Sequence, residues 1–202
     1  MADIQSVCVY CGSSVGADPA FLAAARGFGR ILGRERIRLV YGGGGIGLMG
    51  ALAHAAMEAG GEVIGIIPEC LVAREHAHEG ARDIVVTRDM HERKRIMFER
   101  AEAFVALPGG IGTLEELIEQ LSWLQLGRHR KPVLVLNIKG YWNPLLALLD
   151  HMRAHALLRT RSFELLVAER IEDALLLLRK AARDISESEL RGAATKVTAE
   201  EM

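Results

Sequence analysis

The sequence predicts a single α/β domain in which helices cover both faces of a parallel sheet. Short apolar runs typical of buried strands alternate with longer helical runs almost from end to end. Glycine-rich turns at residues 42–50 and 109–112 directly follow two of the apolar runs, where strands of such a sheet connect to helices. The 202 residues are enough for one domain with a sizeable core.

The boundaries of the elements follow from these runs and from helix-start signals. Asp18 is placed to cap the first helix and Pro19 to begin it. Strands are predicted at residues 7–10, 39–41, 63–67, 84–86, 103–107, 133–136 and 165–167. Further helices are predicted from the first glycine turn to about residue 59, over about 90–100, from the second glycine turn to about 126, and over about 144–155 and 171–182. From Ser186 onward the chain turns polar and loses periodicity, so we expect a domain at residues 1–183 and a flexible tail at residues 184–202.

Composition and charge argue against several functional classes. A formal net charge of −1 gives no electrostatic reason to expect nucleic acid as a partner. No apolar run is long enough to span a bilayer, and the acidic start of the chain does not resemble a signal peptide. We therefore expect no membrane partner and a cytoplasmic location.

The cysteines and histidines form no convincing redox or metal motif. Cys8 and Cys11 have the spacing of a redox pair, but in a strand an odd separation points side chains to opposite faces. Core packing is therefore the better interpretation. The segment from Glu75 to Glu79 holds two histidines and two glutamates, yet no matching ligand set occurs elsewhere, and a solvated loop is preferred. We predict no metal.

The two glycine turns suggest different ligands. The first contains G-x-G-x-x-G twice, and Glu69 follows at about the spacing of an acid that binds a dinucleotide's ribose, which would indicate a dinucleotide-dependent oxidoreductase. The second opens a helix, whose first backbone N–H groups suit a phosphate. The first motif is weak in so glycine-rich a chain and leaves the second turn unexplained. We therefore favour the second turn as the more specific signal.

Two glutamates directly after the second turn raise a question about its ligand. Thr113 and Glu116 have the spacing of a capping box, in which each side chain satisfies the other residue's backbone N–H. Glu115 would then complement the helix dipole. These residues alone leave a structural and a catalytic role for Glu116 equally open.

The helix predicted over residues 90–100 favours the catalytic role. Arg95 has a glutamate three residues before it and another four residues after it, which places it on an exposed, ion-paired face. Arg93 and Lys94 instead flank the predicted buried stripe of Met90, Met97 and Ala101. Cations in that position need an anionic partner or ligand.

The sequence Met90-His-Glu-Arg-Lys94, followed by Pro108-Gly-Gly-Ile-Gly-Thr-Leu-Glu-Glu116, resembles the paired signature of the LOG (Lonely Guy) family. Members of that family are cytokinin riboside 5′-monophosphate phosphoribohydrolases, although they have often been labelled lysine decarboxylases. The likeness runs from about residue 7 to about residue 179. Supporting stretches are Cys11-Gly-Ser-Ser14, Tyr41-Gly-Gly-Gly44, Gly47-Leu-Met-Gly50, Ile67-Pro-Glu69 and Trp123-Leu-Gln-Leu-Gly127.

The resemblance implies a Rossmann-like homodimer that cleaves the N-glycosidic bond of a nucleoside 5′-monophosphate and needs no cofactor. The products would be an adenine-type base and ribose 5-phosphate. Arg93 and Glu116 match the catalytic pair, and Ser122 stands where plant relatives commonly have threonine. With the two glycine turns, the expected substrate-binding positions are Ser13, Gly43, Gly44, Glu75, Lys94, Gly109, Gly110, Ile111, Gly112, Thr113, Leu114, Glu115 and Ser122.

This chemistry explains an acid beside a phosphate-binding turn. Breaking a ribosyl C–N bond builds positive charge on the sugar, which a carboxylate stabilises. Glu116 would face the sugar, the turn would hold the phosphate, and Arg93 would position the substrate and stabilise developing charge. A dinucleotide-dependent oxidoreductase and a non-catalytic nucleotide-binding module stay open as alternatives at this point.

Overall fold

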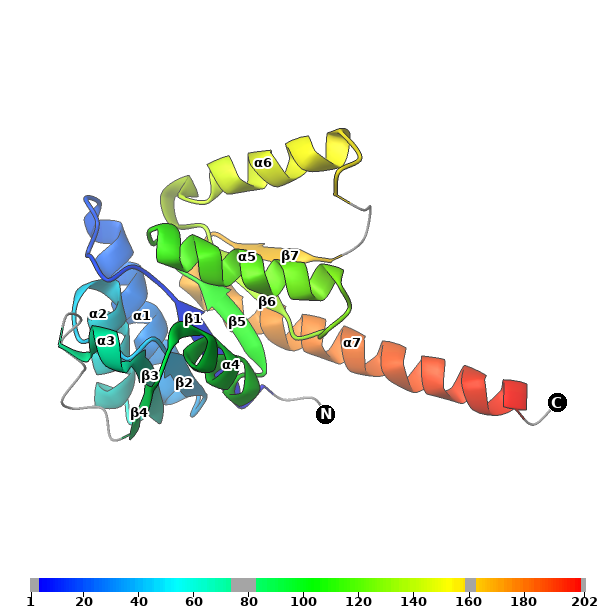
Figure 1. Cartoon of the computed structure of the whole chain (residues 1–202), viewed down its shortest axis with the longest axis horizontal. Helices are drawn as coiled ribbons and strands as arrows, with labels where there is room; N and C mark the ends of the chain where they lie inside the picture. The colour runs from blue at the N-terminus through cyan, green and yellow to red at the C-terminus, as the bar shows by residue number, and fades with distance from the viewer. Residues whose placement is uncertain (1–3, 74–82, 159–162, 201–202) are drawn as a thin grey trace.

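The fold is a parallel sheet with helices on both faces, as predicted (Figure 1). The computed structural model describes residues 4–73, 83–158 and 163–200, with side chains described as far as residue 185. Within these residues, seven strands pair in parallel in the order β4-β3-β2-β1-β5-β6-β7. The strands are β1 Ser6–Tyr10, β2 Arg38–Tyr41, β3 Val63–Pro68, β4 Asp83–Thr87, β5 Ala103–Ala106, β6 Val133–Leu136 and β7 Leu165–Ala168.

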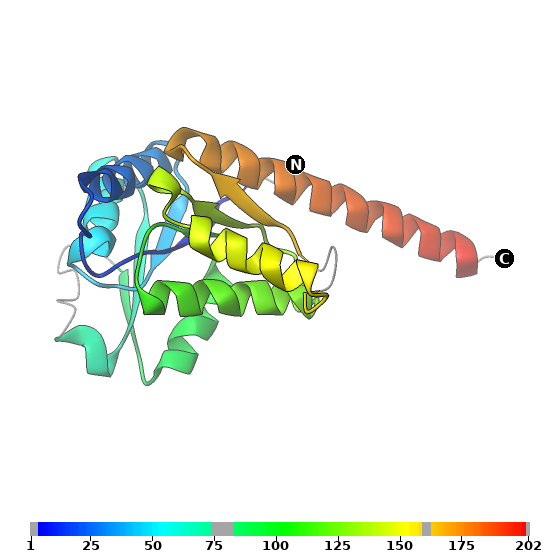
Figure 2. The ribbon, with the colours of Figure 1, turned by 90° about the horizontal axis from the view of Figure 1, so that it is seen from above.

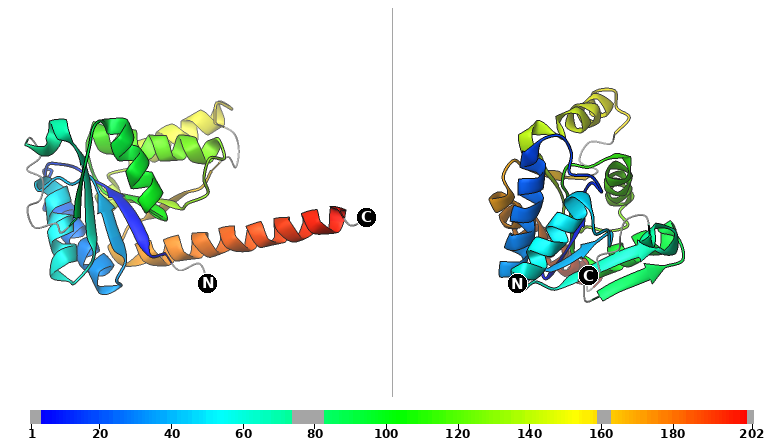
Figure 3. Two further views of the ribbon diagram at one scale, coloured as in Figure 1. Left: turned by 60° about the horizontal axis from the view of Figure 1, so that its bottom comes forward. Right: turned by 90° about the vertical axis from the view of Figure 1, so that its left-hand side faces the viewer.

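The helices divide between the two faces of the sheet, which gives two buried apolar clusters (Figures 2 and 3). One cluster packs α1, α2 and α7 against the sheet, and the other packs α4, α5 and α6. The helices are α1 Pro19–Arg34, α2 Gly47–Glu58, α3 Glu69–Val72, α4 Met90–Arg100, α5 Ile111–Gln125, α6 Asn143–Ala154 and α7 Ile171–Glu200, with a 3₁₀ turn, η1, at Ile138–Gly140. In the described part of the chain, no helix is long and apolar enough to cross a membrane.

Local signals in the sequence account for several of these elements. The side chain of Asp18 accepts a hydrogen bond of 2.8 Å from the backbone N–H of Ala20, so the predicted cap of α1 is confirmed. Cys8 and Cys11 are both buried and unbridged, and they belong to different apolar clusters. Their predicted role in core packing is therefore confirmed.

The order in which the chain adds strands to the sheet reverses between β1 and β5. From β1 the strand order runs outward through β2 to β4, and from β5 it runs the other way through β6 to β7. The chain leaves β1 for α1 on one face and leaves β5 for α5 on the opposite face. The loops after these two strands therefore diverge, and the crevice between them is where such folds bind ligands.

The end of α7 differs from the prediction. The helix was expected to end near residue 182, but it continues to Glu200 and projects away from the sheet (Figures 1 and 3). Residues 183–200 contain no proline and are rich in strong helix formers such as alanine, glutamate and arginine. A segment without hydrophobic periodicity has no apolar side to pack against the core, but it can still form a helix. The boundary at residue 183 and a flexible tail stay predictions.

Candidate active site

A cavity of about 330 Å³ lies at the carboxyl ends of β1, β2 and β5, at the change in strand order. This volume is within the range of small-molecule sites. It collects residues from the loop after β1, both glycine turns, α4 and α5. Its lining consists of Val9, Tyr10, Cys11, Gly12, Ser13, Gly42, Met49, Leu71, Met90, Arg93, Gly110, Ile111, Gly112, Thr113, Glu115 and Glu116.

The start of α5 presents open backbone to this cavity. Gly110 is the N-cap residue, no side chain caps the helix, and the N–H of Leu114 makes the first bond back to the carbonyl of Gly110. The N–H groups of Ile111, Gly112 and Thr113 therefore have no partner within the helix. A Cβ atom added at Gly110 or at Gly112 would meet nothing within 4 Å. The protein's own packing does not require these glycines, whereas a bound anion would use the open backbone.

The capping-box alternative for Glu116 is wrong. Thr113 is the third residue of α5 and not its N-cap, because the helix begins at Ile111. Its buried side chain lies against Gly109, where an added Cβ would collide with the Thr113 hydroxyl. Glu116 therefore lies in the second turn of the helix, too far along to cap its start.

A buried ion pair joins α4 to α5 at the cavity. Arg93 Nη2 lies 3.5 Å from Glu116 Oε1, and the two side chains are only 7% and 11% exposed. The Nε atom of Arg93 is buried and has no hydrogen-bond partner in the described part of the chain. Gly42 makes room for this arrangement, since a Cβ there would collide with Arg93 Nη2. Keeping a charge pair and an unsatisfied donor buried is costly unless a ligand uses them.

The predicted facing of α4 is confirmed for both arginines. Arg95 is 58% exposed and pairs with Glu99 at 3.2 Å and with Glu92 at 3.9 Å, whereas Arg93 is buried. Lys94 also has anionic partners, as expected of a cation beside the buried stripe. Its Nζ lies 2.6 Å from Glu115 and 2.9 Å from Glu119. Lys94 is not among the residues that line the cavity; it borders a neighbouring groove between α4 and α5.

The remaining predicted site residues are only partly brought together. Ser13 lines the cavity, whereas Gly109 lines a smaller adjoining one of about 280 Å³. Gly43 and Gly44 follow β2 without lining the cavity, and Leu114 packs partly into the core. Ser122 is exposed on α5, and Glu75 lies outside the described residues, as does the whole segment from Glu75 to Glu79.

The sequence did not predict an apolar wall of the cavity formed by Met49, Leu71 and Met90. Met49 lies in the first turn of α2, and Met90 is the first residue of α4. The first turn of a helix that follows a strand lies close to this crevice. The positions of Met49 and Met90 in the sequence could therefore have indicated the wall. These flexible side chains give the cavity apolar surface beside its charged groups, since Met90 Sδ lies 3.8 Å from Arg93 Nη1.

The first glycine turn is closed by the protein itself. The backbone N–H groups of Leu48 and Met49 both donate to the carbonyl of Gly12, at 3.0 and 3.3 Å. A Cβ at Gly47 would collide with the backbone of Ser13, and one at Gly50 with the backbone of Gly45. Glu69 is exposed at the start of α3 and does not line the cavity. This turn lacks the open backbone that a dinucleotide's pyrophosphate requires.

Two buried side chains of the cavity, Tyr10 and Cys11, are held in their neutral forms. Burial, reinforced by the nearby charge of Glu116, raises the pKa of the Cys11 thiol far above its usual value. Burial also raises the pKa of the Tyr10 hydroxyl. Both groups therefore stay protonated and add no charge to the cavity. Among the described residues, no three His, Cys, Asp or Glu side chains are grouped to hold a metal ion.

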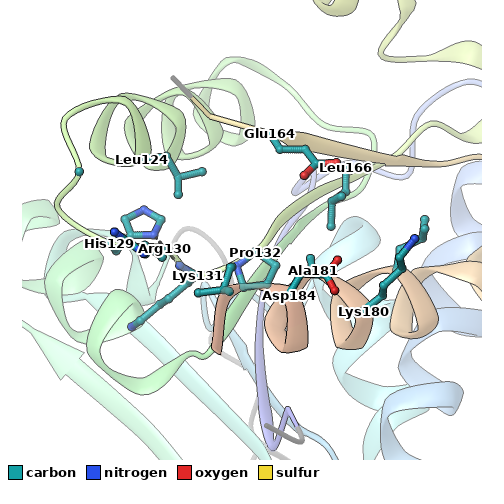
Figure 4. A pocket seen from close by; sticks show the side chains of 13 residues that line it. Leu124, His129, Arg130, Lys131, Pro132, Glu164, Leu166, Lys180, Ala181 and Asp184 are labelled. Carbon is teal, nitrogen blue, oxygen red and sulfur yellow. Dashed lines mark hydrogen bonds between the residues drawn. The ribbon is translucent and has the colours of Figure 1, made fainter. Parts of the chain in front are cut away.

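A larger cavity, of about 500 Å³, lies at the opposite end of the sheet, beside β7 and α7 (Figure 4). It adjoins the amino ends of β6 and β7, remote from both glycine turns. His129 Nε2 lies 3.3 Å from the carbonyl of Gln120, and its Nδ1 accepts from the N–H of Lys131. Lys131 Nζ donates to the carbonyl of Phe98 at 2.7 Å. His129 and Lys131 are thus used within the fold, and the cavity lies away from both glycine turns and from the Arg93–Glu116 pair, so we do not take it as the candidate active site.

The protein is thus a Rossmann-like α/β protein whose crevice, uncapped helix start and buried Arg93–Glu116 pair form a candidate site for a small anionic molecule. The family model described as "Possible lysine decarboxylase" matches residues 49–178. A cytokinin riboside 5′-monophosphate phosphoribohydrolase of Rhodococcoides fascians is 44% identical over 87% of this chain and 89% of its own length. The enzyme LOG7 of Arabidopsis thaliana, which has the same functional name, is 50% identical over 72% of this chain and 67% of its own. The chain belongs to this phosphoribohydrolase family.

Solved structures with little sequence identity share the fold. The molybdenum cofactor carrier protein of Chlamydomonas reinhardtii is 21% identical, with a TM-score of 0.67 over 88% of this chain and 97% of its own. The molybdenum cofactor binding protein of Rippkaea orientalis is 22% identical, with a TM-score of 0.64 over 89% of this chain and 98% of its own. At this level of identity the likeness concerns the fold alone.

Proposed function

We propose that the protein hydrolyses the N-glycosidic bond of adenosine 5′-monophosphates, including N6-modified ones, and releases the free base and ribose 5-phosphate. The observation that carries the proposal is the buried Arg93–Glu116 pair beside the open start of α5. Relatives that bear this functional name at 44% and 50% identity support it. No metal or redox cofactor is part of the proposal.

The 5′-phosphate binds at the start of α5 in this proposal. The N–H groups of Ile111, Gly112 and Thr113 can donate to its oxygens, and the positive end of the helix dipole favours its charge. Ser13 adds a hydroxyl from the loop after β1. The apolar wall of Met49, Leu71 and Met90 suits the flat face of the base.

Glu116 acts on the sugar. The bond between ribose C1′ and the base nitrogen breaks, and its electron pair leaves with the base. Water adds its hydroxyl to C1′, and its proton balances the departing base. The Glu116 carboxylate stabilises the positive charge that develops on the sugar and orients the water, while Arg93 holds Glu116 in place and stabilises the charge of the base or of the attacking water.

Substitutions at the pair test this function. The free base released from AMP and from prenylated AMP would be measured by chromatography. Glu116→Gln should lower turnover of the folded protein by about 10³-fold or more, because the charge that acts on the sugar is lost while the side chain keeps its size. Its melting temperature should also fall, since Arg93 is left as a buried charge without its carboxylate. Arg93→Ala should be similarly inactive, whereas Arg95→Ala, on the exposed face of the same helix, serves as the matched control and should be nearly silent. Retained activity in Glu116→Gln, or equal effects at both arginines, would exclude Arg93 and Glu116 as the catalytic pair. If the unaltered protein binds AMP without turning it over, a binding module would be favoured instead.

We also propose that the protein is a homodimer. Ile111 and Ile118 are exposed on one side of α5, and Leu126, the residue that caps its carboxyl end, is exposed as well; Ile111 is 83% and Leu126 73% exposed. Exposed apolar stripes of this kind usually mark interfaces. Ser122 is about 9 Å along the helix from Glu116 and does not line the cavity of its own chain. Light scattering should give twice the chain mass at micromolar concentration, and a monomer there would contradict the dimer.

A further inference from the structure

The carbonyl groups of Pro108 and Gly109, just before α5, are each bound by a donor from another part of the chain. The N–H of Gly12, in the loop after β1, donates to the carbonyl of Pro108 at 3.2 Å. The hydroxyl of Tyr141, in the connection between β6 and α6, donates to the carbonyl of Gly109 at 2.5 Å. A carbonyl oxygen carries partial negative charge and would repel a phosphate. These hydrogen bonds keep both carbonyl oxygens directed at protein donors.

The hydrogen bond from Tyr141 also sets the direction of the next N–H group. In a planar trans peptide the C=O and N–H groups point in opposite directions. Because the Gly109 carbonyl points to Tyr141, the Gly110 N–H points away from it. Tyr141 lines the smaller adjoining cavity, whereas Gly110 also lines the candidate active site. No backbone carbonyl among the described residues accepts from the Gly110 N–H, so this group is available to an anion.

The peptide between Gly109 and Gly110 needs such an outside contact to keep its direction. It has glycine on both sides, so rotation of this peptide meets little steric resistance from its own residues. A Cβ atom added at Gly110 would meet nothing within 4 Å, so no neighbouring group packs against that residue. A rotated peptide would present its carbonyl oxygen, instead of the Gly110 N–H, to a bound phosphate.

The connection that carries Tyr141 is fixed by contacts of its own. Lys139 has a positive φ of 56°, a conformation that is costly for a residue other than glycine and persists only where neighbouring contacts define it. The buried side chain of Asn137 accepts from the N–H of Trp142 at 2.8 Å. The Tyr141 ring packs edge-on against Phe21 and Trp142, with 5.3 and 5.1 Å between ring centroids. Packing therefore holds the ring in place independently of the hydrogen bond to Gly109.

We propose that Tyr141 is a positioning residue for recognition of the 5′-phosphate. Its hydroxyl fixes the Gly109–Gly110 peptide, so that the Gly110 N–H joins the three N–H groups at the start of α5 in binding the phosphate. Tyr141 does not touch the substrate and acts only through this peptide. The inference rests on the proposed function, because it deepens the phosphate site of that proposal.

Tyr141→Phe tests this role, because it removes the hydroxyl and keeps the ring. One hydrogen bond to a charged ligand would be lost or reversed. Affinity for ribose 5-phosphate, measured by isothermal titration calorimetry, should therefore fall about tenfold. KM for AMP should rise by a similar factor and kcat should change less than about threefold, since Glu116 is not disturbed. The melting temperature of the ligand-free protein should change little, because the Tyr141 side chain is exposed and keeps its ring contacts.

Tyr41→Phe is the matched control. It also removes one tyrosine hydroxyl, but the Tyr41 oxygen is buried with no hydrogen-bond partner in the described part of the chain. Affinity for ribose 5-phosphate should be unchanged in this variant. An equal loss of affinity in both variants would overturn the role of Tyr141, and so would unchanged affinity in Tyr141→Phe or a fall in kcat with unchanged KM.

NMR spectroscopy tests whether Tyr141 acts through Gly110. Saturating ribose 5-phosphate should shift the amide signal of Gly110 in the unaltered protein, because its N–H becomes a donor to the phosphate. The shift should be smaller in Tyr141→Phe, and an equal shift in both proteins would contradict the proposed route. Binding of ribose 5-phosphate does not depend on turnover. Failure of the unaltered protein to release base from AMP would therefore count against the proposed function alone.

Discussion

The two glycine turns of this protein look alike in sequence and differ in what fills them. Both turns follow the carboxyl ends of inner strands, β2 and β5, and each leads into a helix. In the first, backbone of the loop after β1 occupies the space beside Gly47, and backbone of Gly45 in the same turn occupies the space beside Gly50. In the second, the space beside Gly110 and Gly112 is empty of protein. Glycine therefore serves close backbone packing in one turn and leaves room for a ligand in the other.

The difference shows that glycine spacing alone does not identify an anion site. The first helical N–H groups must also be unused, and at α2 those of Leu48 and Met49 are bonded to Gly12. The first turn supports the site in another way, because Gly42 at its start leaves room for the guanidinium group of Arg93. We therefore regard the first turn as the scaffold of the site and the second as its binding surface.

The largest test of this comparison is removal of the 5′-phosphate from the substrate. If the second turn is the anion site, adenosine loses several charge-assisted hydrogen bonds that AMP makes. Three such bonds at about 1.5 kcal/mol each correspond to roughly a thousandfold in kcat/KM, and looser placement of the sugar adds to the loss. Initial rates of base release from AMP and adenosine would measure this ratio.

Comparable rates on AMP and adenosine would contradict the role given to the second turn.

NAD provides the matching test of the first turn. In that turn the N–H groups of Leu48 and Met49 are already bonded to Gly12. We therefore expect no turnover of NAD and no tight binding of NAD in isothermal titration calorimetry. A tight complex would mean that the first turn opens to bind a pyrophosphate, and the contrast between the turns would be lost.

Most elements of the fold could be predicted because each has a local signal. The strand at Val133–Leu136 and the helix at Met90–Arg100 match the predicted ranges, since apolar runs and the cap at Asp89 mark their ends. The opposite facing of Arg93 and Arg95 followed from helical periodicity and the glutamates around Arg95. These features depend on residues within a turn or two of each other.

Features that depend on distant residues could not be predicted in the same way. Whether α5 begins at Ile111 or after Thr113 depends on Thr113 packing against Gly109, which the spacing of a capping box does not reveal. The partners of Lys94 lie 21 and 25 residues away on another helix. The closure of the first turn depends on Gly12, which precedes it by a strand and a helix.

A smaller and sharper test exchanges glycine for alanine in each turn. At Gly112 a methyl group meets no protein atom, and alanine favours a helix over glycine by about 0.8–1 kcal/mol, so Gly112→Ala should melt no lower than the unaltered protein. The methyl group would nevertheless enter the space assigned to the phosphate, and kcat/KM for AMP should fall by about tenfold or more.

At Gly50 the methyl group would collide with the backbone of Gly45, so Gly50→Ala should cost about 1–3 kcal/mol of stability while the folded fraction keeps most of its activity. Thermal unfolding and AMP turnover, measured on the same samples, would check both. An active Gly112→Ala or a fully stable Gly50→Ala would show that the two turns do not divide binding and packing between them.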